Sequence, residues 1–84
     1  MTHHAAPEFW DAYQNLPASV RRQADRTFAK LKSDQYHPSV RFKQVGRYWS
    51  ARVGLHYRAV ALRDENEFIW FWIGTHAEYD KLLR

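Results

Sequence analysis

A chain of 84 residues has room for one domain, residues 1–84, whose modest core must use large side chains. The chain contains no cysteine, which excludes disulfides and cysteine metal sites, and no apolar run long enough to cross a membrane, so we expect a cytoplasmic protein. The net charge of +4 is unevenly spread, because residues 35–63 contain no Asp or Glu; such a one-signed surface attracts a polyanion or an acidic protein.

The opening segment, MTHHAA, lacks the apolar stretch of a signal peptide. Its adjacent His3 and His4 lie close to a chain end and are interpreted as disordered polar residues without a metal role. The rest of the sequence has no metal-ligand spacing, no glycine-rich phosphate loop and no nucleophile elbow. We therefore expect no metal and no cofactor.

Helical periodicity follows this segment. A first helix is predicted to begin at Pro7, which suits a first helical turn, and to end before Pro17. An apolar stripe from Val20 to Leu31 recurs at helical spacing, and most of the charges fall on other sides of that helix. The two segments are therefore predicted to form a helical hairpin.

The period changes to two after the loop SDQYHPS, which indicates strands. We expect strands over residues 41–45, 48–53, 57–63 and 68–73. Short turns join them, so they are predicted to form an antiparallel meander of about four strands. The last strand is apolar on both faces, with Trp70 and Trp72 expected on one face and at least one of them in the core.

The C-terminal sequence predicts a helix start. Thr75 and Glu78 fit the capping-box pattern, so a short helix should follow Gly74. The predicted fold is therefore α+β: a helical hairpin packed on an antiparallel sheet, with a short C-terminal helix.

This last helix also carries residues that are suited to proton transfer. His76 lies in its first turn, and Tyr79 and Asp80 are its neighbours on a helix surface. A histidine, a tyrosine and nearby cations are sufficient for RNA cleavage by attack of the 2′-hydroxyl, and which group accepts the proton stays open. Alternatively, His76 only ends the strand and begins the helix, and Tyr79 only packs in the core.

Four segments in order resemble the RelE/ParE superfamily of type II toxin–antitoxin toxins, in particular RelE-like and YafQ/HigB-like mRNA interferases. They are PEFWDAYQNLP, HPSVRFKQVG, YWSARVGLHYRAV and FWFWIGTHAEYDKLL, which together cover nearly the whole chain. The resemblance implies a small α/β toxin that cleaves mRNA in the ribosomal A site and that a cognate antitoxin neutralises.

The resemblance also implies roles for individual residues. Arg58 corresponds to the arginine of the YR strand, His76 to the histidine of the GTH ending, and Tyr79 lies close to an aromatic catalytic residue of several members. Asp80 stands where YafQ-like toxins carry an aromatic side chain. The expected RNA-binding cations are Arg41, Lys43, Arg47 and Arg52.

Two other functions remain open. A ParE-like toxin inhibits DNA gyrase without cleaving RNA, although such a binder does not need a histidine at this ending. A non-catalytic basic module would bind RNA or protein, with a steep salt dependence for RNA, and would cut nothing.

Overall fold

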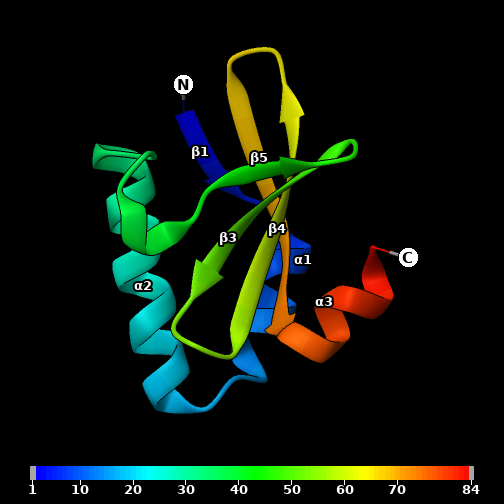
Figure 1. Cartoon of the computed structure of the whole chain (residues 1–84). Coiled ribbons are helices and arrows are strands. Elements are labelled where there is room, and N and C mark those ends of the chain that lie inside the picture. Colours follow the sequence, from blue (N-terminus) through cyan, green and yellow to red (C-terminus); the bar gives the residue numbers. More distant parts are fainter. Residues whose placement is uncertain (1, 84) are drawn as a thin grey trace.

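The computed structural model describes residues 2–83 and confirms the α+β class (Figure 1). The elements in chain order are β1 (Thr2–Ala5), α1 (Pro7–Gln14), α2 (Ala18–Ser33), the 3₁₀ turn η1 (Pro38–Val40), β2 (Lys43–Val45), β3 (Tyr48–Val53), β4 (Tyr57–Asp64), β5 (Glu67–Thr75) and α3 (His76–Leu82). Within the described part of the chain, no helix is long and apolar enough to cross a membrane.

The sheet has five strands in the order β1-β5-β4-β3-β2, one more than the sequence predicted. β2 to β5 form the expected antiparallel meander, whereas β1 pairs in parallel with β5. The interpretation of His3 and His4 as disordered residues is therefore wrong, because both lie in β1 and pair with Phe68 and Ile69.

His3 is buried, and its contacts explain why the short strand β1 forms. Its Nδ1 accepts a hydrogen bond of 3.0 Å from Nε1 of Trp70, and its Nε2 lies 3.0 Å from Oε1 of Gln35. Its ring stacks on Phe68 and meets Phe42 edge to face. An imidazole with both nitrogens bonded can be buried at little cost, so the first strand becomes part of the core.

The hydrophobic core lies between the sheet and the two N-terminal helices. α1 packs on β5 and α2 on β3, and Figure 1 shows α1 behind the sheet. The core-facing side chains of the sheet are Ala51, Val53, Ala59, Ala61, Phe68, Trp70 and Ile73. The opposite face, on which α3 packs, is called the α3 face below; it carries Arg52 and Arg58, which alternate with those core residues.

A β-bulge in β5 separates the two tryptophans that were expected to share a face. Ala61 pairs with Trp70, but Val60 pairs with Trp72 and Ala59 with Ile73, so the register shifts between Val60 and Ala61. Trp70 is buried in the core, whereas Trp72 falls on the α3 face and is only half-buried. The extra residue of the bulge changes the alternation within the strand.

β2 is shorter than predicted. It begins at Lys43, because η1 places Val40 in the core and the chain then turns through Arg41. Arg41 has a φ of 44° and a ψ of 49°, which is the left-handed region and outside strand geometry.

Candidate functional site

The start of α3 has the predicted capping box. Oγ1 of Thr75 accepts a hydrogen bond of 3.2 Å from the amide of Glu78, and Oε1 of Glu78 accepts one of 2.9 Å from the amide of Thr75. The same oxygen accepts a bond of 2.9 Å from the hydroxyl of Thr75, and the bonds from the amide and the hydroxyl of Thr75 hold the pKa of the Glu78 carboxyl below its usual range. The amide of His76 donates to the carbonyl of His56 over 2.8 Å, so the ring of His76 takes no part in the cap.

The imidazole of His76 is half-exposed and has two neighbours on its own helix. Nδ1 lies 3.3 Å from Oδ2 of Asp80, one turn further on. The ring of Tyr79 meets it edge to face, with centroids 5.8 Å apart. Tyr79 is 8% exposed, so it anchors α3 on the sheet, while His76 and Asp80 lie at the surface.

Arg58 reaches the same place from β4. Its guanidinium carbon lies 5.6 Å from the centroid of the Tyr79 ring. Its Nη1 is buried and has no hydrogen-bond partner among residues 2–83. In the sheet, Arg58 is paired with Arg52 on β3 and with Gly74 on β5. Like charges in directly opposed positions destabilise a sheet, and neither arginine has a carboxylate partner within the described residues.

The structure therefore brings the three predicted catalytic residues together. Arg58 contacts Tyr79, and Tyr79 contacts His76, on the face where α3 meets β4. Such a group offers a cation with a free donor, an imidazole and a phenol within one small area. This combination can bind a phosphate and exchange protons with its oxygens.

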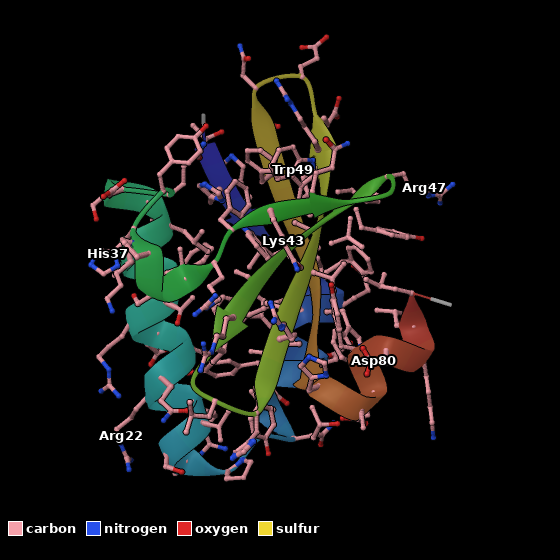
Figure 2. The ribbon with its side chains drawn as sticks, viewed as in Figure 1. Arg22, His37, Lys43, Arg47, Trp49 and Asp80 are labelled. Atoms are coloured by element: carbon pink, nitrogen blue, oxygen red, sulfur yellow. The ribbon has the colours of Figure 1, made fainter. Side chains whose placement is uncertain are left out.

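Two of the predicted RNA-binding cations lie apart from this group. Lys43 is exposed on the α3 face, as its pairing with Ser50 requires, and it lies at the front of the sheet in Figure 2. Arg47 lies in the turn between β2 and β3, with its guanidinium carbon 5.3 Å from the centroid of Tyr48. Figure 2 shows Arg47 projecting away from the body of the molecule.

The other two, Arg41 and Arg52, line a groove of about 690 Å³ between α2, η1 and the end of β3. The groove is called the basic groove below; its polar lining includes Arg26, Lys30, His37, Ser39, Arg41 and Arg52. Sequence reasoning missed Arg26 and Lys30, since both precede the acid-free stretch. Their spacing of four residues places them on one helix face, and this spacing could have indicated a basic surface on the second helix.

Among residues 2–83, no group of three His, Cys, Asp or Glu side chains is arranged to hold a metal ion.

The sequence matches a family model described as the ParE-like toxin domain over residues 18–81, a range that includes Arg58, His76, Tyr79 and the basic groove. A search of curated proteins finds no match.

Solved structures share the fold at low sequence identity. The RelB–RelE antitoxin–toxin complex from Methanococcus jannaschii aligns with a TM-score of 0.69 and 13% identity, over 95% of this chain and 98% of that one. The YoeB/ParE toxin from Agrobacterium tumefaciens gives a TM-score of 0.67 and 16% identity, over 90% of this chain and 99% of that one. The isolated E. coli RelE toxin aligns with a TM-score of 0.64 and 11% identity, over 99% of this chain and 98% of that one. These likenesses establish a RelE-like fold.

Proposed function

The chain belongs to the ParE-like toxin domain family, in the RelE/ParE superfamily of type II toxin–antitoxin toxins, and we propose that it is a metal-independent endoribonuclease that cleaves mRNA on the ribosome. The observation that carries this proposal is the unpaired, buried Nη1 of Arg58 beside Tyr79, whose ring in turn meets His76. A buried guanidinium nitrogen without a partner is costly, and a phosphate oxygen would satisfy it.

In the proposed reaction, the 2′-oxygen of a ribose attacks the adjacent phosphorus and the bond from phosphorus to the 5′-oxygen breaks. The products are a 2′,3′-cyclic phosphate and a 5′-hydroxyl. His76 and Tyr79 supply the two proton transfers, one from the 2′-hydroxyl and one to the leaving 5′-oxygen. Arg58 stabilises the additional negative charge on the phosphate.

Asp80 acts through His76 in this proposal. Its carboxylate lies 3.3 Å from Nδ1, a position that favours the tautomer with the ring proton on Nδ1 and leaves Nε2 open to the substrate. The aspartate where YafQ-like toxins have an aromatic residue therefore has a role of its own, as a positioning residue.

The proposed setting is the bacterial or archaeal cytoplasm, where ribosomes and mRNA are found. The proposed partners are the ribosome with its mRNA and a cognate antitoxin. The antitoxin is supported by the RelE homologue from M. jannaschii, which was crystallised as a complex with RelB. The acid-free stretch of residues 35–63 would suit an acidic segment of such a partner as well as RNA.

Induction of the protein in cells, followed by mapping of RNA 5′ ends, tests this proposal. The wild-type protein should arrest translation and produce cuts inside codons. His76→Ala should reduce cleavage roughly 10²–10⁴-fold, as expected for loss of a general acid or base. Arg58→Gln should also reduce it, and thermal melting of both variants verifies that they fold. Full toxicity of a His76→Ala, Arg58→Gln double variant would contradict the proposal.

A second candidate, inhibition of DNA gyrase, is favoured by the description of the matching family model as ParE-like. It predicts DNA damage while translation is initially unaffected, and loss of supercoiling activity when purified gyrase is mixed with the protein. Inhibition of gyrase together with intact mRNA would support this candidate. RNA binding without inhibition of gyrase and without cleavage would indicate a non-catalytic basic module.

A further inference from the structure

We propose that the basic groove beside α2 is a second phosphate-binding site, which holds the backbone of single-stranded RNA at nucleotides outside the cleaved linkage. This inference rests on the proposed function, because it assumes that RNA reaches the α3 face. It assigns a role to Arg26, Lys30, His37 and Ser39, which the catalytic group does not use.

The charge of the groove is the first reason. Among residues 2–83, four cations line it, from α2, from the loop after η1 and from β3, and no carboxylate does. Three of the four are arginines, whose planar guanidinium groups bind phosphate oxygens in pairs. A concave surface of one sign also concentrates the electric field and attracts a polyanion.

The hydrogen bonds at the groove wall are the second reason. Nζ of Lys30 donates to Oγ of Ser39 over 3.0 Å, and this hydroxyl lies 2.8 Å from Nδ1 of His37. Nδ1 of His37 also accepts from the amide of Ser39, over 3.2 Å. In the neutral ring the proton is therefore on Nε2. The wall thus fixes the lysine in place and presents further N–H donors to an anion.

The backbone at Arg41 is the third reason. A left-handed conformation is unfavourable for any residue except glycine, and strained residues of this kind concentrate at ligand-binding positions. With a φ of 44°, the chain leaves η1 so that the side chain of Arg41 lines the groove opposite α2. This backbone conformation therefore directs a guanidinium into the groove.

Arg52 connects the groove with the candidate catalytic group. It lines the groove, its Nε donates to the carbonyl of Gly54 over 2.9 Å, and it is the cross-strand partner of Arg58. Directly opposed residues in a sheet have Cβ atoms about 5 Å apart. The positive surface therefore continues from α2 to Arg58, along a path that a nucleic-acid backbone can follow.

The groove suits RNA better than a protein segment. Protein interfaces are anchored by buried aromatic side chains, and in the described part of the chain no aromatic residue other than His37 lines this groove. The chain has an aromatic groove elsewhere, between α1 and α2, where Phe9, Trp10, Tyr13 and Phe28 gather. The basic groove offers charge and hydrogen-bond donors, which are the means of binding a phosphate backbone.

Fluorescence anisotropy with a labelled 2′-O-methyl oligoribonucleotide tests the inference. The oligonucleotide has about 12 nucleotides, a length within the range bound by single-strand-binding folds. Methylation blocks the 2′-oxygen, so the ligand binds without being cleaved. Lys30→Gln and Arg41→Gly are the test variants, and glycine tolerates the left-handed backbone. Arg22→Gln is the matched control, since Arg22 is an exposed arginine of the same helix that does not line the groove, and Figure 2 shows it on the outer side of α2.

Each test variant should weaken binding and reduce the slope of log K against log salt by about 0.7, the value for one phosphate contact in single-stranded nucleic acid. Arg22→Gln should keep the wild-type slope. Wild-type slopes in both test variants, or an equal reduction in Arg22→Gln, would overturn the inference. So would test variants that bind RNA normally but lose binding to a polyglutamate peptide, which would make the groove a peptide site.

The test separates this inference from the proposed function. If the protein cleaves no RNA but Lys30→Gln and Arg41→Gly still reduce the salt slope, the nuclease proposal fails and the groove remains a phosphate site.

Discussion

The guanidinium carbon of Arg58 lies 5.6 Å from the centroid of the Tyr79 ring, so β4 and α3 meet through a cation and an aromatic face. A contact of this kind stabilises by roughly 0.5–2 kcal/mol, more when it is desolvated. Tyr79 is the buried residue of α3, and its ring also meets His76 edge to face. The position of His76 relative to Arg58 therefore depends on one ring.

Tyr79→Phe tests the role of the Tyr79 hydroxyl separately from the role of its ring. The phenylalanine ring keeps the contacts with Arg58 and His76, so the melting temperature should stay within a few degrees of the wild-type value. RNA cleavage should fall by about 10²-fold or more, because one of the two proton transfers is lost. Tyr79→Ala, in contrast, should destabilise the protein by about 3–5 kcal/mol, since it empties a buried aromatic site. Unchanged cleavage by Tyr79→Phe would leave the tyrosine with a packing role only.

Asp80→Asn tests the orientation of His76. The amide has nearly the shape of the carboxylate but not its charge, so the preference for a proton on Nδ1 of His76 should be lost. Hydrogen bonds to charged groups contribute about 1.5–3 kcal/mol, and the half-exposed position of this pair favours the low end, so cleavage should fall about tenfold. The ¹⁵N shifts of the imidazole report the tautomer directly. A tautomer population equal to that of the wild-type protein would remove Asp80 from the mechanism.

Gly74→Ala should destabilise the junction of β5 and α3. A Cβ at this position would lie 2.5 Å from Cζ2 of Trp72 and 3.0 Å from Oε1 of Glu78. Overpacking of this kind costs about 1–3 kcal/mol, which corresponds to a fall in melting temperature of about 4–8 °C for each kcal/mol in a domain of this size. The same substitution in a Trp72→Leu background should cost much less, because the ring that blocks the Cβ is absent. Equal costs in both backgrounds would show that the tryptophan is not the obstacle.

Local sequence patterns were sufficient for most of the fold. The spacing of apolar residues located both helices of the hairpin, alternation located the meander, and the pattern Thr75-x-x-Glu78 located the start of α3. They also placed His76, Tyr79 and Asp80 on one helical surface, and the structure shows these contacts. Interactions within one or two turns of chain are expressed in such spacings.

Features that depend on distant residues were not predictable in this way. β1 consists of four residues and forms only because β5, more than 60 residues away, offers a parallel edge and Trp70 offers a donor for His3. The bulge in β5 is a feature of the pairing between β5 and β4, and the residue types of β5 do not indicate where it lies. The basic groove joins α2 to η1 and β3, so its members are scattered along the chain.

The buried His3 makes stability depend on pH. Burial lowers the pKa of its imidazole below the ordinary value of about 6.5, and protonation of Nδ1 would remove the hydrogen bond from Trp70. As pH falls below about 6.5, the unfolded chain binds a proton at this residue while the folded chain does not. The free energy of unfolding should therefore decrease with falling pH, by at most about 1.4 kcal/mol per pH unit, until the pKa of the folded state is reached.

Urea unfolding at pH 7.5, 6.5 and 5.5 measures this slope, and His3→Gln is the control. Glutamine has no proton to gain in this range, and its side-chain oxygen can still accept from Trp70, so its unfolding free energy should change less over the same interval. Glu78, whose pKa is also lowered, loses its stabilising contribution only at more acidic pH, because carboxyls titrate near 4.3 in the unfolded chain. Equal slopes for the two proteins between pH 6.5 and 5.5 would mean that His3 gains its proton equally in the folded and the unfolded chain, in conflict with its buried position as an acceptor for the Trp70 indole.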